Sequence, residues 1–264
     1  MKKVLITGAN SYIGMSFENY IKENYPEHYE VDTVDMIEGT WRKKSFVGYD
    51  SVFHVAGIAH QKETKETSNL YYEINRDLAF SVAQKAKHDG VKQFVFFSSM
   101  SVYGMDTGVV TSETVPNPKN NYGKSKLQAE KQIVPLADED FKVAVLRPPM
   151  VYGAGCKGNY QTIVKLVKKL PVFPYVKNRR SMIHVNKLVC FVKEIIDTNT
   201  SGLFFPQDDA YIQTSAMAQD IAKSIHKKLY LSRFLGACVL VMIPFSKMVR
   251  KAFGSLIYVR QEKQ

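Results

Sequence analysis

The chain has 264 residues, of which 45% are hydrophobic, and a formal net charge of +11 at pH 7. This is enough apolar material to bury a core in one large domain, or in one domain with a small appendage. The three cysteines lie far apart, with no CxxC or Cys/His cluster, so we expect no disulfide framework and no metal site, and the pattern favours a reducing cytoplasm.

The positive charge is concentrated near the carboxyl end of the chain. Residues 221–264 contain nine Lys or Arg against one acid, a balance of about +8. The rest of the chain is nearly neutral at about +3, so the charge does not predict a nucleic-acid-binding face. The longest apolar stretch, Phe234 to Phe245, is shorter than the ~20 residues that a membrane-spanning helix needs.

Short apolar runs alternate with helix-length amphipathic segments over the first two-thirds of the chain. This alternation predicts an α/β fold with a doubly wound parallel sheet of Rossmann type. The apolar runs are rich in Val, Ile and Phe, as expected of strands that are buried on both faces. In chain order we predict strand Lys3 to Thr7, helix Tyr12 to Glu23, strand Glu30 to Asp35, strand Ser51 to Val55, helix Ser68 to His88, strand Gln93 to Ser98, helix Tyr122 to Val134 and strand Lys142 to Arg147.

The pattern changes after Arg147, where loop-like sequence surrounds a basic helix candidate near Thr162 to Leu170. We therefore expect a nucleotide-binding domain over residues 1–147 and a small substrate-binding region, interleaved with the core, over residues 148–230. Residues 231–264 form a basic amphipathic tail. We expect the tail to dock on the body; the alternative is that it lies on an anionic membrane surface.

The segment TGANSYIG follows the first strand directly and opens into a helix. Glycines let a backbone approach a pyrophosphate, and a helix N-terminus offers N–H groups and a partial positive charge. An ordinary strand-ending turn is the alternative. Ser11 stands where a middle glycine is common and adds a side chain near the expected phosphate. The residues predicted to bind the cofactor here are Gly8, Asn10, Ser11, Tyr12, Ile13 and Gly14.

Asp35 ends the second predicted strand, where a carboxylate would accept hydrogen bonds from the adenine-side ribose and repel a 2′-phosphate. This favours NAD over NADP. The basic run Arg42, Lys43 and Lys44 leaves NADP open, because these side chains could pair with a 2′-phosphate.

Tyr122 and Lys126 stand four residues apart at the start of a predicted helix, so their side chains share one face. A nearby ammonium and a positive nicotinamide ring would both lower the pKa of a tyrosine, which could then exchange protons with a sugar hydroxyl. An ordinary surface helix face is the alternative. Ser98 and Ser99 end the preceding strand at the ligand crevice of such folds, within reach of the same substrate oxygen.

Six motifs in order resemble the NAD-dependent epimerase/dehydratase family of extended short-chain dehydrogenases, which act on nucleotide sugars. They are TGANSYIG, HVAG, SSMSVYG, SETVPNPKNNYGKSK, LRPPMVYGAG and RRSMIHV.

The resemblance implies that Tyr122 is the acid/base and that Lys126 lowers its pKa and holds the nicotinamide ribose. Ser99 matches the substrate-positioning serine or threonine, with Ser98 as the alternative. Further implied sites are Ala56 and Gly57 beside the cofactor, Asn75 near the nicotinamide, for which a helix-surface amide is the alternative, and Arg180 on the nucleotide diphosphate.

The chain departs from the family pattern where the substrate would bind. Met150 stands where many family epimerases have a substrate-binding asparagine, and Asn159 is the candidate for supplying an amide nearby. The stretch from Met36 to Tyr49 is shorter than the usual third strand and helix. The chain also ends where family members often continue, so we expect a reduced sugar-binding region.

The leading hypothesis is an NAD(P)-dependent 4-epimerase of a nucleotide sugar, UDP-linked, in polysaccharide biosynthesis. A 4-ketoreductase of the same sugars shares this chemistry, and a catalytically idle dinucleotide-binding regulatory module is the rival from another class. The resemblance also implies a homodimer formed through the helices at Ser68 to His88 and Tyr122 to Val134.

Overall fold

The structure, a computed structural model, describes residues 1–59, 64–156 and 158–260, without the side chains of Glu38, Lys65, Glu66 and Asn159. The chain forms two compact units. Unit 1 comprises Met1–Gly104, Pro116–Pro149 and His184–Pro206, and unit 2 comprises Met105–Val115, Met150–Ile183 and Gln207–Gln264. The chain therefore leaves unit 1 and returns to it twice before it ends in unit 2.

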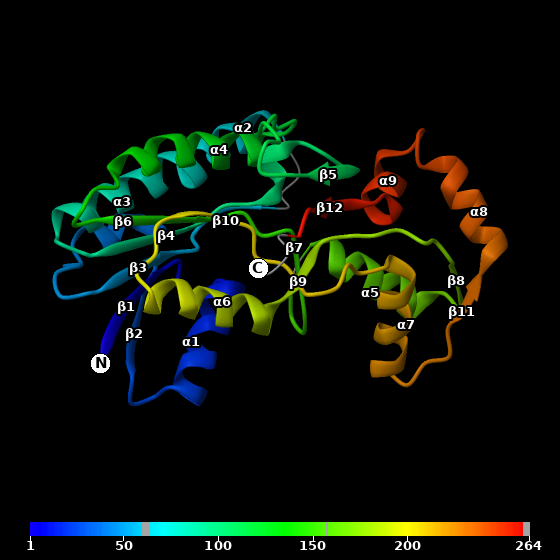
Figure 1. The fold of residues 1–264 in the computed structure, drawn as a ribbon, viewed down its shortest axis with the longest axis horizontal. Helices are drawn as coiled ribbons and strands as arrows, with labels where there is room; N and C mark the ends of the chain where they lie inside the picture. The colour runs from blue at the N-terminus through cyan, green and yellow to red at the C-terminus, as the bar shows by residue number, and fades with distance from the viewer. Residues whose placement is uncertain (60–63, 157, 261–264) are drawn as a thin grey trace. The chain divides into compact units, whose positions relative to one another are not determined.

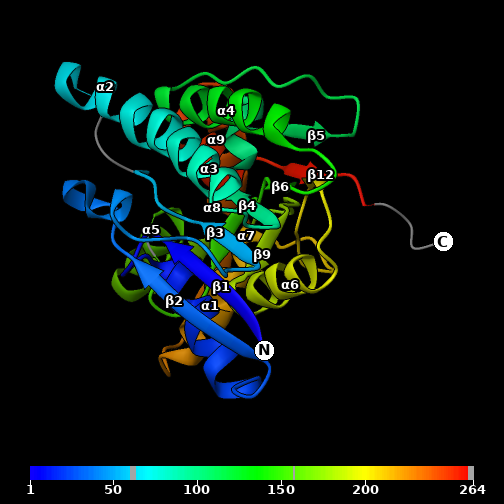
Figure 2. The same ribbon diagram turned by 90° about the vertical axis from the view of Figure 1, so that its left-hand side faces the viewer.

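Unit 1 is built on a six-stranded sheet of order β10-β6-β4-β3-β1-β2, in which all neighbours run parallel. Helices α2, α3 and α4 cover one face of the sheet, and α1 and α6 cover the other (Figure 1 and Figure 2). This confirms the predicted Rossmann-type fold. The strands are β1 (Lys2–Thr7), β2 (Tyr29–Val34), β3 (Ser51–His54), β4 (Gln93–Phe97), β6 (Lys142–Leu146) and β10 (Gly202–Phe204).

The helices of unit 1 include the three that the sequence predicts. The predicted helix from Ser68 to His88 is divided by a π-helical turn, which connects α2 to α3. The helices are α1 (Tyr12–Asn24), α2 (Lys65–Tyr72), the π turn η2 (Glu73–Leu78), α3 (Ala79–His88), α4 (Asn121–Ile133) and α6 (Val185–Asp197), with short 3-10 turns η1 (Ile37–Arg42), η3 (Met100–Tyr103) and η4 (Val134–Leu136).

The five predicted strands agree with the structure to within one residue at each end. Strand β10 is missing from the prediction because it lies at the sheet edge and is only three residues long. An apolar run of that length is too short to indicate a strand.

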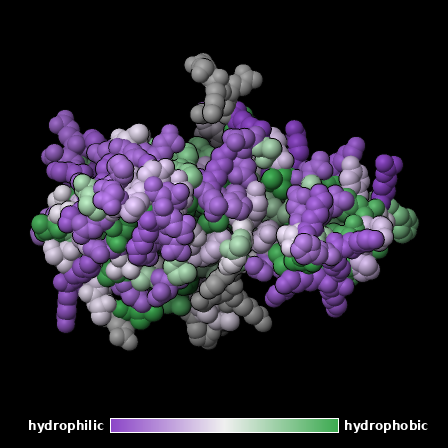
Figure 3. All heavy atoms as spheres, turned by 90° about the horizontal axis from the view of Figure 1, so that it is seen from below, coloured by the Kyte–Doolittle hydropathy of each residue, from purple (hydrophilic) through white to green (hydrophobic). Residues whose placement is uncertain are grey.

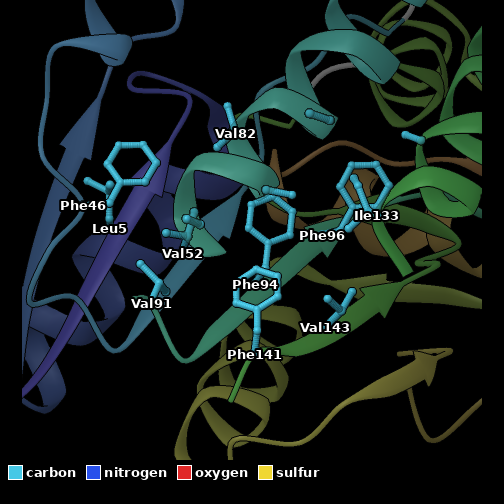
Figure 4. Close-up of a cluster of buried hydrophobic side chains, with 14 of the residues drawn as sticks. Leu5, Phe46, Val52, Val82, Val91, Phe94, Phe96, Ile133, Phe141 and Val143 are labelled. Atoms are coloured by element: carbon cyan, nitrogen blue, oxygen red, sulfur yellow. The ribbon is translucent and has the colours of Figure 1, made fainter. Parts of the chain in front are cut away.

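A cluster of buried side chains fills the space between the sheet and helices α3 and α4 (Figure 4). Phe94 and Phe96 of β4 project into it, where Phe94 meets Phe141 with ring centroids 6.5 Å apart. Alternate residues of β4 face the other way, as Val95 does, so this central strand is apolar on both sides. The central strands are therefore fixed from both faces, which gives a rigid base for their carboxyl ends.

Unit 2 has its own apolar cluster, to which Phe173, Val167, Met217 and Phe253 contribute. The predicted basic helix is present as α5 and begins earlier, at Asn159. The elements of unit 2 are β5 (Gly108–Val110), β7 (Met150–Tyr152), α5 (Asn159–Lys169), β8 (Val172–Pro174), β9 (Met182–His184), α7 (Thr214–Ser224), β11 (Tyr230–Ser232), α8 (Arg233–Met242), α9 (Lys247–Phe253) and β12 (Leu256–Tyr258).

The tail packs on unit 2 through these last elements. Strand β12 pairs with β5, and β11 pairs with β8. Phe253 of α9 is buried against Phe173, with the ring centroids 5.7 Å apart. Some residues of the tail, such as Phe253, therefore belong to the unit 2 core.

Phe94→Ala should lower the free energy of unfolding by about 3 to 5 kcal/mol, because the fully buried ring leaves a cavity between rigid neighbours. Urea unfolding followed by circular dichroism measures the change. Val47→Ala, at an exposed position of unit 1, is the control and should change the free energy by less than about 0.5 kcal/mol. A loss for Phe94→Ala as small as that of the control would contradict this account of the core.

Candidate active site

The turn after β1 brings the ends of three strands together. Gly8 has φ +114, in the left-handed region, and a Cβ there would lie 2.7 Å from the amide nitrogen of Ala56 after β3. Its N–H donates to the Val34 carbonyl of β2 at 3.0 Å. Only glycine therefore permits this approach of β1, β2 and β3 at their carboxyl ends, which is where ligands bind in open parallel sheets.

Ser11 has a local role at the start of α1. It is the N-cap residue, and its hydroxyl accepts a hydrogen bond from the Gly14 amide at 3.1 Å. A Cβ on Gly14 would lie 2.6 Å from that hydroxyl and 3.0 Å from Ile6, so glycine lets α1 pack closely on β1. Asn10 takes a left-handed φ of 62° in the turn. The serine that the sequence places near a phosphate thus turns its oxygen back to cap the helix.

Asp35 directly follows β2 and is exposed. Its carboxylate accepts a hydrogen bond from the Ile37 amide at 2.9 Å, which orients the side chain at the end of the strand. Among the nearby basic residues, Arg42 stacks on the neighbouring tryptophan at 4.8 Å, and Lys44 lies over a tyrosine ring at 5.6 Å. These two cations therefore already have aromatic partners, whereas the carboxylate is accessible.

Asn75 is fully buried in the π-helical turn η2, which rules out the helix-surface alternative. Its amide accepts from the Ile58 N–H at 2.9 Å and donates to the Ile58 carbonyl at 3.0 Å and to Ser125 at 3.2 Å. A Cβ on Gly57 would lie 2.8 Å from the Asn75 oxygen and 3.3 Å from the Lys126 ammonium. Asn75 thus holds the loop after β3 next to α4. Both N–H donors of its side-chain amide are used in these hydrogen bonds.

The two serines after β4 have different partners. Ser98 is buried and donates its hydroxyl hydrogen bond to Glu130. Ser99 is only partly buried; its hydroxyl accepts a hydrogen bond from the Ser101 amide at 3.1 Å and interacts with the Tyr122 hydroxyl closely enough to lower the tyrosine pKa. The structure therefore places Ser99 beside the tyrosine, whereas Ser98 is directed into the protein interior.

Helix α4 presents Tyr122 and Lys126 on one face, one turn apart. Asn120 caps the helix by accepting a hydrogen bond from the Gly123 amide at 2.8 Å. A Cβ on Gly123 would lie 2.5 Å from the Ser101 carbonyl oxygen, so glycine lets the first turn of α4 press against the segment after β4. This contact brings the Tyr122 and Ser99 segments together.

The expected lowering of the Tyr122 pKa by Lys126 is not seen. Burial raises the pKa of Tyr122, the Ser99 hydrogen bond lowers it in part, and Tyr71 raises it further. The Lys126 ammonium instead donates to the Phe97 carbonyl at 2.8 Å. Tyr122 is thus held protonated, and a phenolate would require additional positive charge at the site.

Burial lowers the pKa of Lys126 to about 8, although the charge of Glu130 opposes this shift. His54, which senses the charge of Lys126, is fully buried, and burial together with that charge lowers its pKa to about 3. The imidazole is therefore neutral and shares a hydrogen bond of 2.8 Å with the Thr7 hydroxyl. The site thus contains a buried ammonium, that of Lys126, whose pKa of about 8 is close to neutral pH.

A buried ion pair below the site was not predicted from the sequence. Arg147, directly after β6, contacts Glu130 of α4 at 2.5 Å, and its other arm donates to the Tyr103 hydroxyl at 2.8 Å. Both charged side chains are almost completely buried. The available signal was Glu130 one helical turn after Lys126, together with an arginine at the end of an apolar strand. Buried charges of this kind occur in pairs.

Of the predicted substrate residues, Ser99 belongs to unit 1, and Asn159 and Arg180 belong to unit 2. Arg180 is held by backbone hydrogen bonds with Ile212, and its guanidinium donates to the Gly254 carbonyl at 2.7 Å. Burial lowers its pKa, and the charge of Asp106 only partly offsets this. The guanidinium forms no ion pair within the described part of the chain. The predicted role of Asn159 rests on a side chain that lies outside the described residues.

The donor set in unit 1 fits a nicotinamide dinucleotide. The glycine turn runs into a helix N-terminus, which suits a diphosphate, and the Asp35 carboxylate suits ribose hydroxyls. In the described structure, the Lys126 ammonium has one acceptor, the Phe97 carbonyl, so two of its three N–H donors can serve a second ribose.

A comparison of the sequence with known protein families agrees with this donor set. The sequence model of the NAD dependent epimerase/dehydratase family matches residues 4–203. The chain belongs to this family. Members of this epimerase/dehydratase family are NAD- or NADP-dependent enzymes, which is the cofactor class that the sequence predicts.

Two relatives match most of the length of this chain. UDP-glucose 4-epimerase of Vibrio cholerae is 31% identical over 86% of this chain and 76% of its own. N-acetyl-alpha-D-glucosaminyl-diphospho-ditrans,octacis-undecaprenol 4-epimerase of Escherichia coli O157:H7 is 25% identical over 86% of this chain and 73% of its own.

Solved structures show the same fold at lower identity. dTDP-4-dehydrorhamnose reductase from Bacillus anthracis str. Ames, in complex with NADP, has a TM-score of 0.75 and 21% identity, covering 99% of this chain and 92% of its own. MoeE5, in complex with UDP-glucose and NAD, has a TM-score of 0.72 and 20% identity, covering 98% of this chain and 90% of its own.

Glu130→Gln should lower the free energy of unfolding by about 3 to 5 kcal/mol, because it leaves the Arg147 guanidinium buried without its counter-charge. The double variant Glu130→Met/Arg147→Met should lose less than the sum of the two single variants. Urea unfolding of the parent, Glu130→Met, Arg147→Met and the double variant measures the coupling, and Glu130→Gln is unfolded alongside them. The exposed pair Glu18–Lys22, treated in the same way, should couple by less than about 1 kcal/mol. Equal coupling for the two pairs would contradict this interpretation.

Lys126→Met should weaken NAD binding roughly 10- to 100-fold, because a charged hydrogen-bond donor is lost. NAD affinity of the parent protein should fall as the pH rises through about 8, where the buried ammonium of the free protein loses its proton. The variant should lack this pH dependence. Fluorescence titration with NAD across that pH range measures both effects, with Lys124→Met, exposed on the same helix, as the control. An unchanged pH profile in Lys126→Met would exclude this role.

Proposed function

We propose that this chain is an NAD-dependent 4-epimerase of UDP-linked sugars, in the biosynthesis of polysaccharides. The observation that carries the proposal is the interaction of the Ser99 hydroxyl with Tyr122, whose pKa it lowers, with Lys126 one helical turn further along α4. The similarity to the UDP-glucose 4-epimerase of Vibrio cholerae supports the substrate class.

Tyr122 moves the proton in this proposal. Its hydroxyl is protonated in the unliganded protein, because burial raises its pKa. When bound, NAD supplies the hydride acceptor at its nicotinamide and a positive charge that favours the phenolate. Ser99 orients the sugar 4-hydroxyl toward Tyr122, which takes the proton from that oxygen and later returns it. Lys126 donates to ribose hydroxyls while its bond to the Phe97 carbonyl keeps the ammonium in place.

Arg180 is proposed to bind the diphosphate of the nucleotide sugar. A half-buried guanidinium without an ion-pair partner in the described structure gains from an anion, and its planar donors match phosphate oxygens. Its bond to the Gly254 carbonyl uses one arm and leaves donors for the ligand. For Asn159 we keep the proposal that its amide contacts the sugar.

Tyr122→Phe should lower kcat for UDP-glucose epimerisation by about 10²- to 10⁴-fold, because the proton-transferring hydroxyl is removed while the ring is kept. The assay supplies UDP-glucose without added cofactor and detects the 4-epimer by chromatography. The matched control is Tyr20→Phe. Tyr20 lies on α1, outside the site, and its hydroxyl forms a hydrogen bond with that of Tyr25.

The same purified protein is then given a UDP-4-keto sugar with NADH or NADPH, and also the undecaprenyl-diphosphate-linked N-acetylglucosamine named for the Escherichia coli relative. Turnover of the keto sugar alone would replace the epimerase by a 4-ketoreductase. Turnover of the lipid-linked sugar alone would move the substrate from UDP to a lipid carrier. If no substrate reacts and Tyr122→Phe changes nothing measurable, the chain is an idle dinucleotide-binding module.

A further inference from the structure

Helix α8 packs on unit 2 through a narrow line of residues. Gly236 is buried against the Tyr175 backbone, and Val239 and Ile243 rest on the apolar cluster of unit 2. These three positions are three and four residues apart, so they form one stripe along the helix. The rest of the helix surface is directed away from the cluster.

The outward surface of this segment is apolar, where a surface helix normally carries polar side chains. Residues 234–245 contain no charged residue and no Ser, Thr, Asn or Gln. Phe234 is 78% exposed, Val241 69%, Phe245 86% and Met248 77%. We call the exposed side chains of Phe234, Leu240, Val241, Met242, Phe245 and Met248 the tail patch. On the surface of unit 2, hydrophobic residues are exposed between hydrophilic ones (Figure 3).

Basic side chains flank the tail patch, and acids are missing from its sequence. Between Asp220 and Glu262 the chain has eight Lys or Arg and no Asp or Glu. Arg233, Lys247 and Lys251 are exposed and form no ion pair with the described residues. Arg250 differs, because it lies 3.9 Å from the Asp106 carboxylate. The patch therefore combines exposed apolar groups with cations that lack a counter-charge.

We propose that the tail patch binds the surface of an anionic lipid bilayer. Phe234, Phe245 and Met248 enter the boundary between headgroups and acyl chains, while Arg233, Lys247 and Lys251 contact anionic headgroups. No helix in the described part of the chain is long and apolar enough to cross a membrane, so the contact is a peripheral one.

A second copy of the chain fits the patch less well than a lipid surface. In a two-fold dimer the same surface faces itself, so the unpaired cations at both ends of the patch would approach those of the partner. An anionic bilayer covers the same apolar groups and neutralises the cations. The inference does not depend on the proposed reaction, since it uses only the surface of unit 2.

The test is flotation of the purified full chain with two kinds of vesicle, phosphatidylcholine alone and phosphatidylcholine mixed with phosphatidylglycerol. We expect binding to the anionic vesicles, weaker binding to the neutral ones, and release as salt screens the surface charges. Phe234→Ser/Phe245→Ser should weaken partition by about tenfold or more, because two large apolar side chains no longer enter the lipid. Lys247→Gln/Lys251→Gln should also weaken it, and only on anionic vesicles.

Matched controls separate the patch from general effects of charge and hydropathy. Val115→Ser removes an apolar side chain that is 79% exposed in unit 2 outside the tail, and Lys165→Gln/Lys168→Gln removes two exposed cations of α5. Both should bind vesicles as the parent does. Melting temperature and NAD binding confirm that each variant is folded, and epimerase activity on a soluble substrate reports separately on the proposed function.

The proposal is overturned if the parent does not float with anionic vesicles, or if Phe234→Ser/Phe245→Ser floats as well as the parent. It is also overturned if light scattering shows a dimer that this variant dissociates while no vesicle binding is detected. In that case the occupant of the tail patch is a second copy. Point substitutions are needed, because deleting the tail would remove Phe253 and β12 from the core of unit 2.

Discussion

The ion pair between Glu130 and Arg147 connects helix α4 to the end of strand β6 inside the protein, where neither charge can be left alone. Glu130 also accepts from Ser98 at the end of β4, so one carboxylate fixes a helix and two strand ends. Because Ser98 is held this way, the next residue of the chain, Ser99, is directed toward Tyr122. The positions of the proposed reacting groups thus depend on a contact that lies below the site and takes no part in its chemistry.

The electrostatics of the site follow from the same burial. Lys126 lies near a neutral histidine and donates to a carbonyl, and Glu130, one turn away on α4, stabilises its charge. Glu130 is itself committed to Arg147. The ammonium is therefore easily deprotonated, and Tyr122 keeps its proton. The unliganded site is thus not in the protonation state that proton transfer requires. A ligand that brings hydroxyl acceptors and positive charge would change both conditions in the direction that proton transfer requires.

In unit 2 the terminal helices are apolar on both their inner and their outer sides. Its last helices complete an apolar core on one side, and on the other they present apolar side chains to the surroundings. A chain that only needed to cover its core would place polar residues on that outer side. Arg180, held by the Gly254 carbonyl just after α9, links the same terminal segment to the proposed diphosphate site. The tail thus has a structural role and leaves a surface for a lipid partner.

The sequence by itself determined the fold class, the strand positions and the family, because buried parallel strands and glycine turns leave strong local patterns. It also predicted Tyr122, Lys126 and the glycine turn as site residues, because their spacing along one chain segment is a local signal. Only the tertiary structure decided which serine faces Tyr122, that Asn75 is buried, that Ser11 caps a helix, and that Lys126 donates to a carbonyl rather than lowering the tyrosine pKa. These depend on contacts between segments far apart in the chain, such as Glu130 with Arg147, and on burial, which shifts a pKa through surroundings that the local sequence does not contain.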